Sequence, residues 1–101
     1  MKRDIRWTRR GVSFVCDAQK RLENARKHEI DLIRASEIFF DPFAIVKFDA
    51  EHSNQEDRYG ITGRMENERL AYAAYTLRGI DVRLISARKA TTKEAEQYAK
   101  Q

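Results

Sequence analysis

Cysteine, proline and glycine are scarce in this chain, which has one cysteine, one proline and four glycines among 101 residues. The single cysteine, Cys16, excludes an intrachain disulfide framework and a cysteine-based zinc site. The glycines are scattered and form no Gly-rich phosphate loop, and no GxSxG motif is present for a serine nucleophile. A disulfide scaffold, a P-loop enzyme and a serine hydrolase are therefore all excluded.

Long hydrophobic runs are also absent. No apolar segment approaches the roughly 20 residues that a membrane-spanning helix needs. The chain starts with basic residues, but the apolar stretch of a secretory signal does not follow them. We therefore expect a cytoplasmic protein that does not bind a membrane.

The chain is rich in charged residues and has enough apolar residues to form one small core. Hydrophobic residues make up 42% and charged residues 36%, which is typical of a folded domain rather than a disordered segment. A chain of this length has room for one domain. We predict a basic N-terminal extension at residues 1–10, followed by a single domain at residues 11–101.

The net charge of +4 is unevenly distributed along the chain. Residues 1–28 carry nine Lys/Arg and three Asp/Glu, residues 29–57 carry two and eight, and residues 58–101 carry nine and five. Basic segments at both ends favour a polyanion as the partner. Three solvated faces of different charge would give the same pattern, so this observation alone leaves the partner open.

The hydrophobic pattern predicts alternating short strands and helices. Runs of β-branched and aromatic residues predict strands at residues 12–16, 43–48, 58–63, 70–77 and 82–86. Helical spacing predicts helices at residues 17–28, 31–39 and 91–100, with Asp17, Asp31 and either Thr91 or Thr92 as the capping residues. The predicted order is β-α-α-β-β-β-β-α, an α+β fold with a small antiparallel sheet covered by helices.

Several polar residues suit the cleavage of RNA without a metal. RNA supplies its own nucleophile, the 2′-hydroxyl, so the protein needs only a base, an acid and cations that stabilise the phosphorane. Histidine and glutamate suit the proton transfers, and the charged fork of arginine binds phosphate. The candidates of these types, with one lysine, are Lys27, His28, His52, Glu56, Arg58, Arg83 and Arg88.

Each candidate residue also has an interpretation in which its role is purely structural. The spacing of these residues, taken alone, favours the structural role over a catalytic one. His28 would interact as a cation with the C-terminal end of its helix, and His52 would hydrogen-bond Asp49 in a polar loop. Glu56 and Arg58 would form a surface ion pair worth under about 1 kcal/mol. The two histidines are a weak metal signal without carboxylates. Composition therefore indicates nucleic acid as a partner class but does not indicate catalysis.

Spaced motifs between residues 17 and 98 resemble those of a known family, the BrnT toxins of bacterial type II toxin–antitoxin operons. The matching elements are Asp17, Lys20, Asn24 and Lys27-His28, then Phe40-Asp41-Pro42, Asp49-x-x-His52-Ser53-x-x-Glu56-x-Arg58, Gly63-Arg64, and Arg83-x-Ile85-Ser86-Ala87-Arg88-x-Ala90 with Glu94 and Tyr98. The chain departs from the family pattern at Glu29, where a glycine usually follows Lys-His, and in the length of residues 1–10.

The resemblance implies a RelE-like compact fold and a metal-independent endoribonuclease, without a cofactor, that arrests growth. It also implies inhibition by a BrnA-type ribbon-helix-helix antitoxin, and a complex that binds operator DNA. Glu56 or His52 would be the general base, and the arginines would contact the phosphate. On these family positions we expect catalytic roles for His52, Glu56, Arg58, Arg83 and Arg88, and RNA-binding roles for Lys27, His28 and Arg64. Lys27 and His28 would orient the RNA or donate a proton.

Two other functions remain open at this point. A non-catalytic module would stack Tyr59, Tyr72 and Tyr75 on the bases of single-stranded RNA. An inactive toxin remnant would bind its antitoxin and repress the operon without cleaving RNA. Growth arrest and RNA degradation on expression distinguish an active toxin from both.

Overall fold

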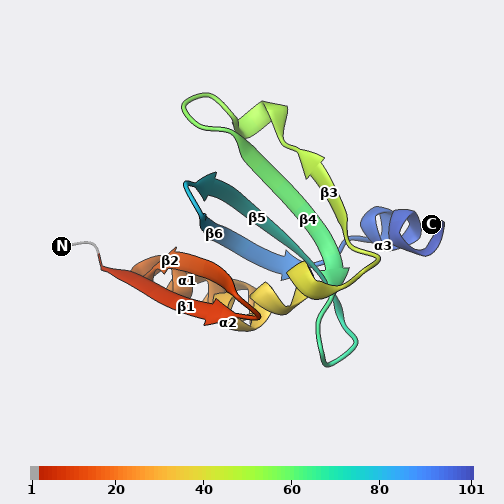
Figure 1. Ribbon diagram of the computed structural model, residues 1–101. Helices are drawn as coiled ribbons and strands as arrows, with labels where there is room; N and C mark the ends of the chain where they lie inside the picture. The colour runs from red at the N-terminus through yellow and green to blue at the C-terminus, as the bar shows by residue number, and fades with distance from the viewer. Residues whose placement is uncertain (1–2) are drawn as a thin grey trace.

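The computed structural model describes residues 3–101, which form an α+β fold around one six-stranded sheet (Figure 1). The strands are β1 (Asp4–Arg9), β2 (Val12–Asp17), β3 (Ile45–Phe48), β4 (Arg58–Arg64), β5 (Leu70–Arg78) and β6 (Asp81–Lys89). The helices are α1 (Ala18–His28), α2 (Leu32–Ala35) and α3 (Thr92–Ala99), with two 3-10 turns, η1 (Ser36–Phe40) and η2 (Ala50–His52). Within this described part, no helix is long and apolar enough to span a bilayer.

The sheet is mixed, with the strand order β1-β2-β6-β5-β4-β3. The predicted order β-α-α-β-β-β-β-α is wrong because it lacks β1. The prediction of an antiparallel sheet is also wrong at one pair, since β2 and β6 run parallel while the other neighbours are antiparallel. The chain leaves β2 through two helices, and the meander from β3 to β6 ends with β6 pointing the same way as β2.

Residues 4–9 belong to this sheet, rather than to an extension outside the domain. They form β1, which pairs with β2 along its whole length. The Trp7 ring stacks on Phe14 at a centroid distance of 5.6 Å, and the indole N–H donates a hydrogen bond to Ser36 Oγ at 3.1 Å. Residues 1–2 of the predicted extension lie outside the described residues.

Capping residues set the ends of the first two helices. Asp17 caps α1 as predicted, because its carboxylate accepts hydrogen bonds from two backbone N–H groups of the first turn. The helix ends at Glu29, which is in the left-handed conformation with φ 59°. Asp31 caps α2. The helix predicted at residues 31–39 is α-helical only to Ala35 and continues from Ser36 as the 3-10 turn η1. The Ser36 hydroxyl donates a hydrogen bond to the Ile33 carbonyl at this change.

The two faces of the sheet carry different residues. One face meets α1, α2 and η1 and contains the core, with Phe14, Cys16 and Leu84 at most 1% exposed. We call the opposite face the polar face. It is open over β1, β2 and β6, whereas α3 lies against its other end, beside β4 (Figure 1).

A β-bulge in β6 decides which arginines reach the polar face. Five positions separate Arg83 from Arg88, and in a regular strand that odd spacing would place them on opposite faces. The register shift leaves Ile85 unpaired, so that Arg83 lies opposite Thr76 and Arg88 lies opposite Tyr72. Both arginines therefore lie on the polar face.

Candidate functional site

A groove of about 400 Å³ lies on the polar face, where β1, β2, β4, β5 and β6 approach one another. Three residues predicted as catalytic line it: Glu56, Arg58 and Arg83. Register explains the meeting of the two arginines, because Arg58 and Arg83 both stand opposite Thr76 on the strand between them. We call this site the polar groove; its other polar lining residues are Asp4, Asp17, Lys20, Thr76 and Arg78.

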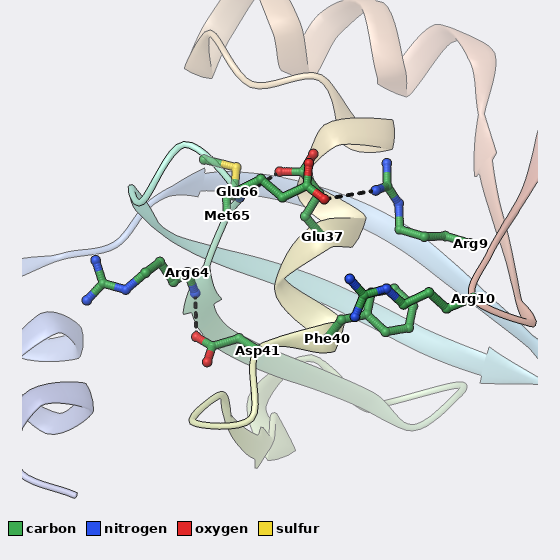
Figure 2. Close-up of a pocket in the computed structure, with 8 residues that line it drawn as sticks. All are labelled: Arg9, Arg10, Glu37, Phe40, Asp41, Arg64, Met65 and Glu66. Carbon is green, nitrogen blue, oxygen red and sulfur yellow. Dashed lines mark hydrogen bonds and ion pairs between the residues drawn. The ribbon is translucent and has the colours of Figure 1, made fainter.

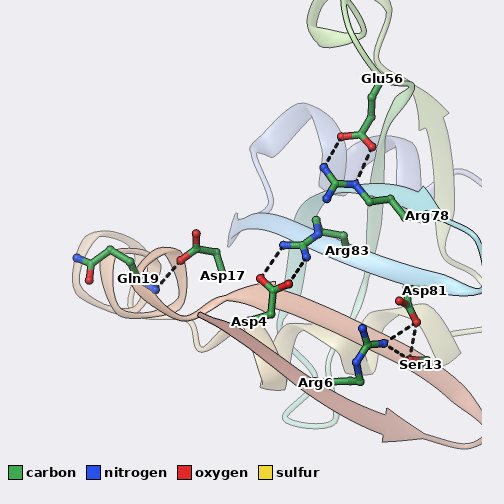
Figure 3. A network of polar contacts seen from close by, with 9 residues as sticks. All are labelled: Asp4, Arg6, Ser13, Asp17, Gln19, Glu56, Arg78, Asp81 and Arg83. Carbon is green, nitrogen blue, oxygen red and sulfur yellow. Dashed lines mark hydrogen bonds and ion pairs between the residues drawn. The ribbon is translucent and has the colours of Figure 1, made fainter. Parts of the chain in front are cut away.

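Two bidentate ion pairs cross the polar groove (Figure 3). Arg78 donates from Nε and Nη2 to the two oxygens of Glu56 at 2.9 and 3.0 Å. Arg83 donates from Nη2 and Nη1 to the two oxygens of Asp4 at 2.7 and 3.3 Å. The hydrogen bond from Arg78 holds the pKa of Glu56 below its ordinary value, and Arg83 does the same for the pKa of Asp4.

Two cations of the polar groove have no such partner. Neither Arg58 nor Lys20 has a carboxylate within 4.0 Å among residues 3–101, although both line the groove. Backbone contacts fix the start of β4, because the Arg58 N–H donates to Ser53 Oγ at 2.9 Å and its carbonyl accepts from the Asp49 N–H at 2.8 Å. A free guanidinium beside two carboxylate-bound ones offers the charge and the hydrogen-bond donors that a phosphate group accepts.

The loop before β4 carries Glu56 into the polar groove but leaves His52 outside it. The Thr76 hydroxyl donates to the carbonyl of Asp57 at 2.8 Å, which ties the loop to β5 next to Glu56. His52 lies in η2, with Nδ1 2.9 Å from Asp49 Oδ2 and a side chain that is 59% exposed. The hydrogen bond to Asp49 is the one expected from the structural interpretation of this histidine.

His52 also belongs to a three-residue cluster that has ligand types for a metal. Ligand atoms of Asp49, Glu51 and His52 lie within 4.8 Å of one another. Glu51 and His52 are exposed, and Asp49 already accepts a hydrogen bond from the backbone of η2. The arrangement is that of a capped 3-10 turn.

Arg88 lies on the polar face but outside the polar groove, where it joins α3 to the sheet. Its Nη1 and Nη2 atoms donate to both oxygens of Glu94 at 2.8 and 3.0 Å, and its guanidinium lies 4.3 Å from the centre of the Tyr72 ring. Arg88 thereby lowers the pKa of Glu94. Glu94 also completes a capping box with Thr91 at the start of α3.

The three predicted RNA-binding residues lie away from the polar groove. His28 and Arg64 line another groove, of about 990 Å³, near the ends of α1 and β4. Lys27 is exposed on α1. The backbone N–H of Arg64 donates to Asp41 at 2.8 Å, and its side chain points away from Arg9 and Arg10 in Figure 2.

Sequence reasoning did not assign the other five polar lining residues to the site, among them Asp4, Lys20 and Arg78. Asp4 was assigned to the extension, and Arg78 to a turn after β5. Arg78 follows Thr76 at the two-residue spacing of one strand face, so a longer β5 would have placed both beside Arg58. Lys20 follows the cap of α1, and only the packing of that helix beside β6 carries it to the groove.

Comparisons with known proteins identify the class of protein. The family model described as "Ribonuclease toxin, BrnT, of type II toxin-antitoxin system" matches residues 16–94. The crystal structure of the Brucella abortus ribonuclease toxin BrnT resembles the fold with a TM-score of 0.56 and 20% identity, over 76% of this chain and 94% of that one. No curated protein matches the sequence significantly. The family match covers most of the chain, which therefore belongs to the BrnT family of ribonuclease toxins of type II toxin–antitoxin systems.

Proposed function

We propose that the polar groove is the RNA-cleaving site of this toxin. The observation that carries the proposal is the convergence of Glu56, Arg58 and Arg83 with Arg78 in one groove, from segments far apart in the sequence. In the reaction, the 2′-oxygen of RNA forms a bond to phosphorus, and the bond from phosphorus to the 5′-oxygen breaks. The proton of the 2′-hydroxyl goes to the base, and the leaving 5′-oxygen takes up a proton from solvent water.

Arginine supplies the electrostatic part of this mechanism. Arg58 offers a guanidinium that no carboxylate of the described residues holds, and Arg78 and Arg83 each present a fork to a carboxylate. A phosphate is a carboxylate-like bidentate acceptor, so the scissile phosphate would replace Asp4 and Glu56 on these forks. Three guanidinium groups would then stabilise the charge that develops on the phosphorane.

Glu56 is the proposed general base. It stays ionised at neutral pH because Arg78 holds its pKa low, and displacement from Arg78 by the phosphate would free its oxygens beside the 2′-hydroxyl. This set of groups needs no metal ion. The catalytic roles of His52 and Arg88 and the RNA contacts of Lys27, His28 and Arg64 stay predictions, since these residues lie outside the polar groove.

The partner of the toxin is, in this proposal, a BrnA-type ribbon-helix-helix antitoxin, whose complex binds operator DNA in the cytoplasm. The type II family implies a protein antitoxin. Exposed apolar side chains support a protein partner, since Val46, Phe48 and Leu77 are each more than half exposed on the core face of the sheet. Co-purification with the product of the adjacent small gene, followed by an operator-binding assay, tests this part.

Cleavage of RNA by the purified chain tests the proposed site. Replacing Arg83 with alanine should lower kcat by about 100-fold, the scale of losing one preorganised donor to a transition-state oxyanion. Arg26→Ala is the matched control, because Arg26 is an exposed arginine on α1 outside every groove described above. Equal rates for wild type and R83A would exclude the polar groove as the reaction centre, and binding without any cleavage would favour the non-catalytic module or the inactive remnant.

A further inference from the structure

A second groove lies between α3 and the polar face, and the cleavage mechanism does not use it. Its volume is about 320 Å³, at the lower end of the roughly 300–1,000 Å³ typical of small-molecule sites. We call it the α3 groove. The lining residues that matter below are Lys47, Gly60, Thr62, Tyr72, Lys93 and Gln97.

The α3 groove contains hydroxyl groups with unused hydrogen-bonding capacity. Thr62 is only 7% exposed, yet its hydroxyl makes no hydrogen bond to any residue between 3 and 101. The Tyr72 hydroxyl has none within the same range either. Within the described chain, both hydroxyls therefore remain available to donate to or accept from a ligand in the groove.

An aromatic ring supplies the apolar wall of the α3 groove. The side chain of Tyr72 lies across Gly60, and a Cβ atom at residue 60 would overlap the phenol ring. Glycine is therefore required for the ring to lie against β4. Single-stranded RNA is recognised by aromatic side chains on which bases stack, together with hydrogen bonds to the base edges. Arg88 lies 4.3 Å from the centre of the Tyr72 ring, so a base would contact the part of the ring that lines the groove, and Thr62 would supply the polar contact.

Two lysines line the same groove together with two carboxylates, Asp49 and Glu94, which contact His52 and Arg88 respectively. Neither Lys47 nor Lys93 has a carboxylate within 4.0 Å in the described chain, and Lys47 Nζ donates to Gln97 Oε1 at 2.8 Å. They therefore remain available to a phosphate. This differs from Arg78, Arg83 and Arg88, each of which is held by a carboxylate.

Strand β4 contributes residues to both the α3 groove and the polar groove. Arg58, Gly60 and Thr62 are successive residues of β4 on the polar face, so neighbours in this row are about 7 Å apart. One nucleotide of an extended strand spans such a step. If the scissile phosphate of an RNA strand lies at Arg58, the nucleotide next to that phosphate therefore lies in the α3 groove.

We propose that the α3 groove is a nucleotide subsite that selects the base next to the scissile phosphate. The base packs on Tyr72 and hydrogen-bonds Thr62, while Lys47 and Lys93 bind the flanking phosphate. The position of this nucleotide next to the cleaved bond rests on the proposed function. The binding of a nucleotide in the α3 groove is independent of the proposed function.

NMR titration of the full chain with each of the four ribonucleoside 5′-monophosphates tests the subsite directly. We expect at least one nucleotide to shift the Gly60 amide and Thr62 methyl signals. Thr62→Val keeps the shape of the side chain and should weaken that binding about five-fold, the scale of one lost hydrogen bond. Lys93→Met should weaken it at low salt, whereas Lys100→Met, the same charge change at the end of α3, should not.

Mapping of cut sites on a mixed-sequence RNA gives the second readout. Thr62→Val, which removes the hydroxyl, and Tyr72→Leu, which removes the aromatic ring, should still cleave RNA but with a weaker base preference beside the cut. Identical cut patterns for wild type and both variants would overturn the subsite while leaving the cleavage proposal intact. Nucleotide binding at Gly60 without any RNA cleavage would support the subsite and contradict the cleavage proposal. If no nucleotide at millimolar concentration moves the Gly60 or Thr62 signals, the subsite is wrong whether or not the chain cleaves RNA.

Discussion

Individual carboxylates control the chemistry of the polar groove, because each is placed against an arginine. Glu56 and Asp4 accept two hydrogen bonds each from Arg78 and Arg83. The same contacts lower the pKa of both carboxyls and occupy the guanidinium forks that a phosphate would use. At the residue scale the groove therefore holds both the proposed base, Glu56, and a carboxylate, Asp4, that would compete with the proposed RNA substrate for Arg83.

The proposed role of Glu56 as the general base predicts how cleavage depends on pH. A general base must be deprotonated, and Arg78 holds the pKa of Glu56 below its ordinary value, so the base stays active well into the acid range. We expect kcat/KM to stay level from pH 7.5 to roughly pH 5 and to fall only below the ordinary glutamate range near 4.3. A fall centred near pH 6.5, the ordinary value for an imidazole, would show that a histidine is the base instead.

Removing the competitor should strengthen RNA binding. Asp4→Asn keeps the size of the side chain but withdraws the carboxylate from Arg83, so we expect the affinity for a single-stranded RNA to rise several-fold in a low-salt binding assay. Asp81→Asn is the control, because it makes the same charge change on the polar face but releases Arg6 instead. Equal gains from both variants would mean that total charge alone sets the affinity.

At the scale of elements, the ends of helices and the bulge in β6 position the site. The caps at Asp17, Asp31 and Thr91 were predictable because a capping side chain acts within its own turn. The bulge at Ile85 was not predictable, since it depends on pairing with β5 rather than on local sequence. The implied RelE-like label stays a prediction.

The end of α1 contains backbone strain that a substitution should relieve. Glu29 has a φ of 59°, and a residue with a Cβ atom pays about 1 kcal/mol in this conformation that glycine does not pay. Glu29→Gly should therefore raise the free energy of unfolding by about 1 kcal/mol in urea denaturation. Glu23→Gly, inside the same helix, should lower it by about the same amount. Destabilisation by E29G would show that the left-handed conformation is not strained.

At the scale of the whole molecule, β1 completes both the core and the polar groove. Its Trp7 covers Phe14 on one face, and its Asp4 reaches Arg83 on the other. A small domain has few apolar residues to lose, so an edge strand that covers a fully buried phenylalanine matters for stability.

Truncation of this ring tests whether β1 is integral to the domain. Trp7→Ala removes the stacking on Phe14 and the hydrogen bond to Ser36, so we expect the free energy of unfolding to fall by about 3 kcal/mol. Urea denaturation measures the change. Trp7→Phe should recover much of the loss, since it keeps an aromatic ring over Phe14. An unchanged midpoint for W7A would mean that β1 is dispensable, as expected of a terminal extension.

The sequence by itself determined the α+β class, most strands and helices, the helix caps and the family, because these depend on local periodicity and on spaced motifs. It also identified Glu56, Arg58 and Arg83 as candidates without showing that they meet. Only the tertiary structure decided that they share one groove with Arg78 and Asp4, and that His52 and Arg88 lie outside it. The physical reason is that strand register, the bulge at Ile85 and the placement of β1 arise from pairing between distant segments, which no local pattern encodes.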